Sequence, residues 1–258
     1  MLRIIKQACI VGALLTPCLP TSASATWSII VLDRGSGLIG VAAASCTSDV
    51  YGIMALAPGT GALMAQAIGH PPAMREAIRL LRGEAAPDSI LRAITATAFD
   101  TDTPNRQYAI ATFARGQAQF TGAATRDFRG ERNADGVLVQ GSLLTGAAVL
   151  DRALEAIQAA RAAGKPMEEV IMAGLKAGAD AGGDSRCGAQ RATAAFIAVA
   201  KPGDNPNWPY LTLRVVDAER GSGVNAVELL QTRLDLWKTN GGKSLRVTSE
   251  TVRPNSGL

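Results

Sequence analysis

The segment Ala23-Ser24-Ala25-Thr26-Trp27-Ser28-Ile29-Ile30 decides how the rest of this chain is interpreted, because a processing site runs directly into a strand. Mostly apolar residues continue to Asp33, which predicts a β-strand buried on both faces. The small residues that end at Ala25 fit a signal-peptidase site. We therefore expect a mature chain whose first residue, Thr26, is also the first residue of a core strand.

Residues 1–25 have the composition of a secretory signal peptide. Arg3 and Lys6 precede an apolar run over residues 8–15, and small residues then lead to Ala25. The apolar run is much shorter than the ~20 residues of a membrane-spanning helix, so stable membrane insertion is not expected. Cleavage after Ala25 predicts a periplasmic or secreted protein.

A competing processing site lies at Cys18. The sequence Leu14-Leu15-Thr16-Pro17-Cys18 loosely resembles a lipoprotein cleavage box, although Pro17 stands where a small residue is usual. The alternative matters because lipidation at Cys18 would leave Thr26 inside the chain without a free amine.

Length and charge bound the class of protein. Removing the signal leaves 233 of the 258 residues, which suits one large domain over residues 26–237, followed by a polar, poorly ordered tail over residues 238–258. The formal net charge of +4 falls to +2 when Arg3 and Lys6 leave. No strong basic field then remains to predict a nucleic-acid partner. Whether the protein forms a homo-oligomer is left open.

Two of the four cysteines, Cys46 and Cys187, remain after cleavage. An even pair in an exported protein favours a disulfide over a catalytic thiol or a metal site. A bridge across so long a loop would contribute roughly 4 to 5 kcal/mol on the chain-entropy model. His70 is the sole histidine, and its place before Pro71-Pro72 predicts a loop or a helix cap. Neither a metal ion nor another cofactor is predicted.

The predicted elements alternate between groups of strands and pairs of helices. Strands are expected at 26–33, 38–45, 53–57, 61–68, 106–113, 117–122, 137–144, 192–200 and 210–217, and helices at 73–82, 87–99, 147–163, 166–179 and 224–237. The polar segment 125–136 is predicted as a surface loop, and the glycine-rich segment 178–190 as a loop that brings charge close to a site. This order suits an α+β fold, a four-layer αββα sandwich of two stacked, mainly antiparallel sheets.

Four blocks of sequence, in this order, carry a family resemblance. They are Thr26 to Ile30, Gly37 to Ser45, Val139-Gln140-Gly141, and Ala181 to Asp184 with Arg186 and Gln190 beyond it. Together they resemble the uncharacterised family catalogued as domain of unknown function 1028, which is grouped with the N-terminal-nucleophile (Ntn) hydrolases. The resemblance spans about residues 26–217. It implies the αββα sandwich and an N-terminal nucleophile at Thr26, and it implies no substrate.

Two departures from the family pattern bear on activity. Where the family usually has Gln-Gly-Asn, this chain has Gln140-Gly141-Ser142, which removes an amide that could donate to an oxyanion. Cys46-Thr47-Ser48-Asp49 stands where a bulkier, apolar stretch is usual. Both differences fit either a retuned substrate pocket or a chain that has lost activity.

An N-terminal threonine combines a nucleophile and a base in one residue. A hydroxyl needs a base near neutral pH, and an α-amine titrates at about 7.7 to 8.0. The leading hypothesis is therefore an exported Ntn amide hydrolase in which Thr26 attacks a peptide or an amino-acid-derived amide. The plainer interpretation is that cleavage happens to expose a β-branched strand residue.

Four further residues are candidates for the chemistry. Gly141 and Ser142 could supply a backbone donor and a hydroxyl to an oxyanion, or they form an ordinary strand with a bulge. Asp184 and Arg186 could orient the Thr26 ammonium or hold a substrate carboxylate. Their alternative role is a surface salt bridge of little energetic value.

Ser28, Ser45 and Gln66 are predicted to line the substrate pocket, and satisfied core polar groups are the alternative. The second functional hypothesis is a non-catalytic exported ligand-binding protein on the same fold. The third is a component of a surface assembly, for which the Trp208 loop and the tail are the sequence features; a concentration-dependent shift on a sizing column would support it.

Overall fold

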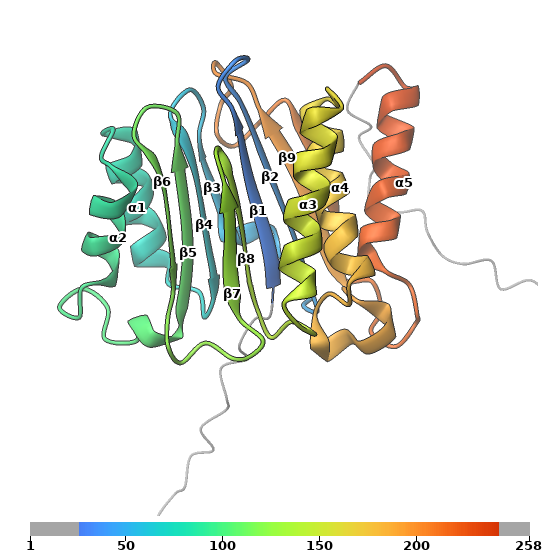
Figure 1. Ribbon diagram of the computed structural model, residues 1–258, viewed down its shortest axis with the longest axis horizontal. Helices are drawn as coiled ribbons and strands as arrows, with labels where there is room; N and C mark the ends of the chain where they lie inside the picture. Colours follow the sequence, from blue (N-terminus) through green and yellow to red (C-terminus); the bar gives the residue numbers. More distant parts are fainter. Residues whose placement is uncertain (1–25, 243–258) are drawn as a thin grey trace, which may run out of the picture.

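The structure, a computed structural model, describes residues 26–242 of the 258-residue chain. Two antiparallel sheets stack face to face, and helices cover their outer surfaces (Figure 1). The predicted α+β four-layer αββα sandwich is confirmed. The predicted signal peptide, residues 1–25, and residues 243–258 of the predicted tail lie outside the described residues.

The larger sheet has six strands in the order β10-β9-β2-β1-β8-β7, which places β1 at its centre. Its strands are β1 (Thr26–Asp33), β2 (Leu38–Ser45), β7 (Gly130–Ala134), β8 (Val137–Ser142), β9 (Ala194–Ala200) and β10 (Leu211–Val215). β1 pairs with β2 on one side and with β8 on the other. Every residue of β1 before Asp33 is buried, as the sequence pattern predicts.

The smaller sheet has four strands in the order β3-β4-β5-β6. They are β3 (Met54–Ala57), β4 (Gly61–Ala67), β5 (Arg106–Thr112) and β6 (Gly116–Thr121). Alternation along β1 divides the core between its two faces. Trp27 and Ile29 pack toward the helices, whereas Ile30 packs between the sheets. Because successive side chains point to opposite faces, Thr26 and Ser28 also face the space between the sheets.

The helices form the two outer layers. α1 (Pro71–Arg82) and α2 (Pro87–Thr95) cover the smaller sheet, and α3 (Ala148–Ala162), α4 (Met167–Asp180) and α5 (Ala226–Thr239) cover the larger one (Figure 1). Single turns of 3-10 helix lie at Tyr51–Ile53 and Thr103–Asn105, and a longer, kinked one at Ser185–Gln190. α4 lies close to β1 because residue 178 is glycine: a Cβ there would sit 2.7 Å from Trp27 Nε1.

One predicted loop contains a strand. Residues 125–136 were expected to run over the surface, but β7 lies within them and pairs with β8 as an edge strand. β7 is polar because its outer edge faces solvent, and charge protects a sheet edge from unwanted pairing. Two helix ends also differ from expectation: α2 stops at Thr95 rather than Phe99, and α5 continues to Thr239, into the predicted tail.

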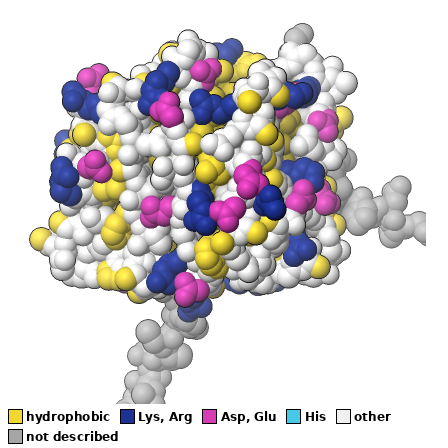
Figure 2. All heavy atoms as spheres, in the orientation of Figure 1, with side chains coloured by type: hydrophobic (Ala, Val, Ile, Leu, Met, Phe, Trp, Pro, Cys, Tyr) yellow, Lys and Arg dark blue, Asp and Glu magenta, His cyan; other side chains and the backbone are white. Residues whose placement is uncertain are grey.

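Two further features concern membrane insertion and the distribution of surface charge. Within residues 26–242, no helix has both the length and the apolar character needed to cross a membrane. On the face shown in Figure 2, Lys and Arg side chains are interspersed with Asp and Glu.

Candidate active site

Three hydroxyl side chains lie in a row at the start of β1. Thr26 pairs with Ser45 of β2 and with Ser142 of β8. Directly opposed residues of antiparallel strands have Cβ atoms about 4.5–5.5 Å apart and point to the same face. All three residues are at most 2% exposed. The structure thus brings together three of the predicted site residues, and Ser28, two positions along β1, faces the same space.

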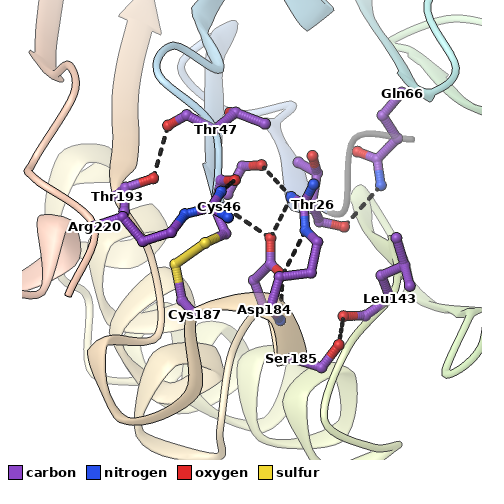
Figure 3. Close-up of polar contacts among 12 residues, drawn as sticks. Thr26, Cys46, Thr47, Gln66, Leu143, Asp184, Ser185, Cys187, Thr193 and Arg220 are labelled. Carbon is purple, nitrogen blue, oxygen red and sulfur yellow. Dashed lines mark hydrogen bonds and ion pairs between the residues drawn. A yellow bond between two sulfur atoms is a disulfide. The ribbon is translucent and has the colours of Figure 1, made fainter. Parts of the chain in front are cut away.

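The smaller sheet contributes amide side chains to this row. Gln66 Nε2 donates to the backbone oxygen of Thr26 at 3.1 Å and to Gln107 Oε1 at 2.8 Å. Figure 3 shows Gln66 reaching Thr26 from the opposite sheet. Gln107 Nε2 in turn donates to the backbone oxygen of Gly141 at 3.1 Å. Gln66 is therefore placed beside Thr26, and it holds the strand backbone.

Several buried polar atoms here have no hydrogen-bond partner among the described residues. They are Thr26 Oγ1, Ser28 Oγ, Ser142 Oγ, Gln66 Oε1, Gln140 Oε1 and Gln140 Nε2. We call these five residues the hydroxyl–amide cluster. An unpaired buried polar group costs about 1–3 kcal/mol, so proteins rarely leave one, and a group of them marks a place that a polar ligand would satisfy.

A second buried polar group lies beside the first, centred on Asp184. Its carboxylate accepts from Cys46 N at 2.7 Å, from Arg186 Nη2 at 2.7 Å, from Arg186 N at 3.0 Å and from Arg186 Nε at 3.1 Å. Asp184 is fully buried, and Figure 3 shows it beneath Cys46 at the end of β2. Together with Cys187 we call these residues the carboxylate clasp.

The glycine-rich segment after α4 builds the clasp. Gly182 and Gly183 have φ values of 124° and 58°, which turn the chain sharply after the helix end. Asp184 then caps the following 3-10 helix by accepting from Arg186 N. The predicted disulfide is confirmed, because Cys46 and Cys187 are bonded with Cα atoms 5.6 Å apart.

The clasp reaches the row of hydroxyls through β2. Cys46 directly follows Ser45, the partner of Thr26, and Arg186 Nη2 lies 3.4 Å from Ser45 Oγ. Arg186 and Asp184 bind each other in a bidentate pair, so the guanidinium that was predicted to hold a substrate carboxylate already holds one. A role of Asp184 in orienting the Thr26 ammonium remains a prediction.

His70 belongs to a different part of the molecule. It occupies the N-cap position of α1, and its Nδ1 lies 3.1 Å from Asp100 Oδ2. Asp100 also accepts from Arg106 Nε at 2.8 Å, and this bond chiefly holds the pKa of Asp100 below its usual value. Within residues 26–242, no group of three or more His, Cys, Asp or Glu side chains is placed to bind a metal ion.

Sequence reasoning missed two members of this region, Gln107 and Gln140. Both are fully buried. Gln140 lies opposite Ser28, and Gln107 lies opposite Gln66. The sequence did contain a signal for them. Each is a glutamine within a mostly apolar strand, at a position whose side chain points toward the second sheet.

The fold and the site together define an α+β sandwich protein with a buried polar site at the start of its central strand. The chain is similar to the crystal structure of protein SPO2555 from Silicibacter pomeroyi, a protein of the DUF1028 family, with a TM-score of 0.69 and 24% sequence identity. The match covers 85% of this chain and 88% of that one, and it concerns the fold. The comparison with curated proteins gives no match. The model of the family of unknown function DUF1028 matches residues 26–223, and the chain belongs to this family.

Proposed function

We propose that this protein is an exported amide hydrolase of the N-terminal-nucleophile type, in which Thr26 becomes the first residue and the nucleophile. One observation carries the proposal. Thr26 starts the central strand, and within residues 26–242 its hydroxyl has no hydrogen-bond partner and lies among other buried donors and acceptors of the same kind. The match to the family also begins at Thr26, and the disulfide is compatible with an exported protein. The substrate would be a small peptide or another amino-acid-derived amide.

The free amine of Thr26 would supply the base. With a pKa of about 7.7 to 8.0, a large fraction of α-amines is neutral at pH 8. The amine accepts the hydroxyl proton as Oγ1 bonds to the substrate carbonyl carbon, and it returns the proton to the leaving nitrogen as the C–N bond breaks. Water then attacks the ester carbon, Oγ1 regains a proton, and the acid product leaves.

The oxyanion would be stabilised by donors that already lie in the site. Ser142 Oγ faces the same space as Thr26, and Gln140 lies two residues along β8, opposite Ser28. Neither Ser142 Oγ nor Gln140 Nε2 has a partner among the described residues. Donors fixed before the reaction stabilise developing charge without a reorganisation cost. The Gly141 carbonyl accepts a hydrogen bond from Gln107 Nε2. Donation from the Gly141 N–H to the oxyanion remains a prediction.

The carboxylate clasp would position these groups. Asp184 fixes the backbone at Cys46, the residue after Ser45, and so sets the end of β2 against Thr26. Since Thr26 is fully buried in the full-length chain, a carbonyl could reach Oγ1 only after this end of β1 opens. Cleavage after Ala25 would free the amine that serves as the base.

The test begins with the protein recovered from the exported fraction of cells that express the full precursor. Intact mass and N-terminal sequencing should identify Thr26 as the first residue. A panel of peptide and aminoacyl amides is then screened for turnover. Thr26→Ala should lower kcat/KM by on the order of 10⁴-fold, whereas Thr26→Ser should retain activity. Thr97→Ala, an exposed control, should change nothing.

Two results would contradict the hydrolase. One is full activity of Thr26→Ala with its terminus and fold intact. The other is a mature terminus elsewhere, such as a lipidated Cys18, which would remove the base.

The alternative is a non-catalytic exported protein that binds a peptide or amino-acid derivative at the same site. The hydroxyl–amide cluster, whose polar atoms named above have no partner within residues 26–242, would serve binding equally well. Ser142 in place of the usual asparagine favours a chain that has lost activity. In that case no variant of the panel would turn over substrate, and Thr26→Ala would change ligand affinity alone.

A further inference from the structure

A groove of about 420 Å³ lies away from the candidate active site. α1 forms one wall, and Pro206 and Asn207 of the β9–β10 connection form the other. The floor is β3, with Met54, Ala55 and Leu56. Its volume falls in the range of sites that bind small molecules or short peptide segments.

The floor of the groove is the edge of a sheet. β3 pairs with β4 on one side, and among the described residues no strand pairs with its other side. An unpaired edge offers backbone donors and acceptors to an added extended segment. Met54 and Ala55 are only partly buried, so this edge is reachable.

The walls of the groove carry positive charge. Arg75 and Arg82 both line it from α1, and among the described residues that line it none is acidic. Neither arginine forms an ion pair with any residue of the described range, whereas Arg79 on the same helix pairs with Glu76. Two turns of helix separate Arg75 from Arg82, about 10.5 Å along the axis. Carboxylates two or four residues apart on an extended peptide are about 7 or 13 Å apart, within reach of flexible arginine side chains.

Apolar side chains also line the groove, and an exposed aromatic residue follows the lining residue Asn207 in the sequence. Met74 and Ile78 of α1 also line the groove. Trp208, directly after Asn207, is 79% exposed. Methionine and tryptophan are typical of surfaces that accept a peptide side chain.

We propose that this groove docks an extended peptide segment that carries carboxylate side chains. The segment adds to the free edge of β3, its carboxylates pair with Arg75 and Arg82, and an apolar side chain packs on Met74 and Ile78. The chain's own C-terminal segment is a poor occupant, because residues 243–258 hold Lys243, Arg246 and Arg253 against a single acidic side chain, Glu250. The proposal does not depend on the chemistry of Thr26.

The test uses the mature protein and a fluorescein-labelled peptide of alternating Glu and Val, eight residues long, with a Lys-Val peptide as the control probe. Fluorescence anisotropy should show saturable binding of the Glu-Val peptide that weakens as salt is added. The double variant Arg75→Glu/Arg82→Glu should weaken it at least about tenfold, and Arg75→Gln/Arg82→Gln by a smaller factor. The matched control Arg92→Glu, on α2 outside the groove, should bind as the wild type does.

Hydrogen exchange distinguishes docking on β3 from binding elsewhere. Amides of β3 should gain protection when the Glu-Val peptide binds. The proposal is overturned if the peptide does not bind, if the charge reversal leaves affinity unchanged, or if β3 gains no protection. Self-association through β3 that the peptide does not compete with would also overturn it and assign the groove to a second copy of the chain.

Discussion

The hydroxyl–amide cluster and the carboxylate clasp lie next to each other, and both are buried and polar, but they differ in how their hydrogen bonds are satisfied. The Asp184 carboxylate accepts four hydrogen bonds from Cys46 and Arg186. The cluster holds six polar atoms without a partner among the described residues. A buried polar group with hydrogen-bond partners stabilises the fold, whereas one without partners lowers its stability. Proteins accept such a loss at functional sites, and we assign the cluster a role in ligand binding. The two regions should therefore respond in opposite ways to mutation.

The largest effect on stability is expected from the disulfide of the clasp. Cys46 and Cys187 are separated by 141 residues. The chain-entropy model gives about 5 kcal/mol for a loop of this length, because the bridge restricts the unfolded state. The double variant Cys46→Ser/Cys187→Ser should lose that much in urea unfolding. A reduced wild type should match it, and a loss below about 1 kcal/mol would show that the clasp holds the loop without the bridge.

The next largest effect is expected at Asp184. Replacing it by alanine leaves the Arg186 guanidinium and the Cys46 amide without their acceptor, which costs about 3–5 kcal/mol for a buried pair. Asp127→Ala, which removes an exposed partner of Arg129, is the matched control and should cost at most about 1 kcal/mol. Equal losses for the two variants, measured by chemical denaturation, would contradict the structural role of the clasp.

Tyr108 tests whether an unpartnered atom alone marks a site. Its hydroxyl is buried without a partner among the described residues, but it lies on the helix-covered face of the smaller sheet, outside the cluster. Burial raises the pKa of Tyr108 to about 12. The unfolded chain releases this proton near pH 10, so above that pH the folded state binds more protons and stability falls as pH rises. The cost at pH 11 should be about 1.4 kcal/mol.

Urea unfolding between pH 8 and pH 11 measures this dependence. Tyr108→Phe should flatten it and should leave activity or ligand binding at Thr26 unchanged. The same slope in both proteins would assign the pH dependence to another group.

The smallest effect on stability is expected inside the cluster. Ser142→Ala removes a buried hydroxyl that has no partner in the described part of the chain, so the free energy of unfolding should stay the same or rise by up to about 1 kcal/mol. Turnover or ligand affinity should nevertheless fall. A destabilisation of about 2 kcal/mol or more would mean that the hydroxyl is satisfied, and the contrast between the two regions would fail.

The sequence by itself determined the elements and the layers. Alternation over residues 26–33 and 38–45 predicted the central hairpin, and helical spacing predicted the helix pairs. The two cysteines left after the expected signal cleavage predicted the disulfide. These features depend on neighbours in the chain or on composition, so local patterns reveal them. The sequence did not predict β7, because this polar edge strand lacks the alternation of apolar and polar residues that marks a half-buried strand.

Only the tertiary structure decided what lies beside Thr26. Strand pairing aligns Ser45 and Ser142 with it and Gln140 with Ser28, and sheet stacking brings in Gln66. The sequence left open whether Arg186 binds a substrate carboxylate or pairs with Asp184, and the turn after α4 brings it onto Asp184. A strand buried on both faces does not reveal which face meets the second sheet, or at what register. That information exists only once strands distant in sequence have paired and the two sheets have packed.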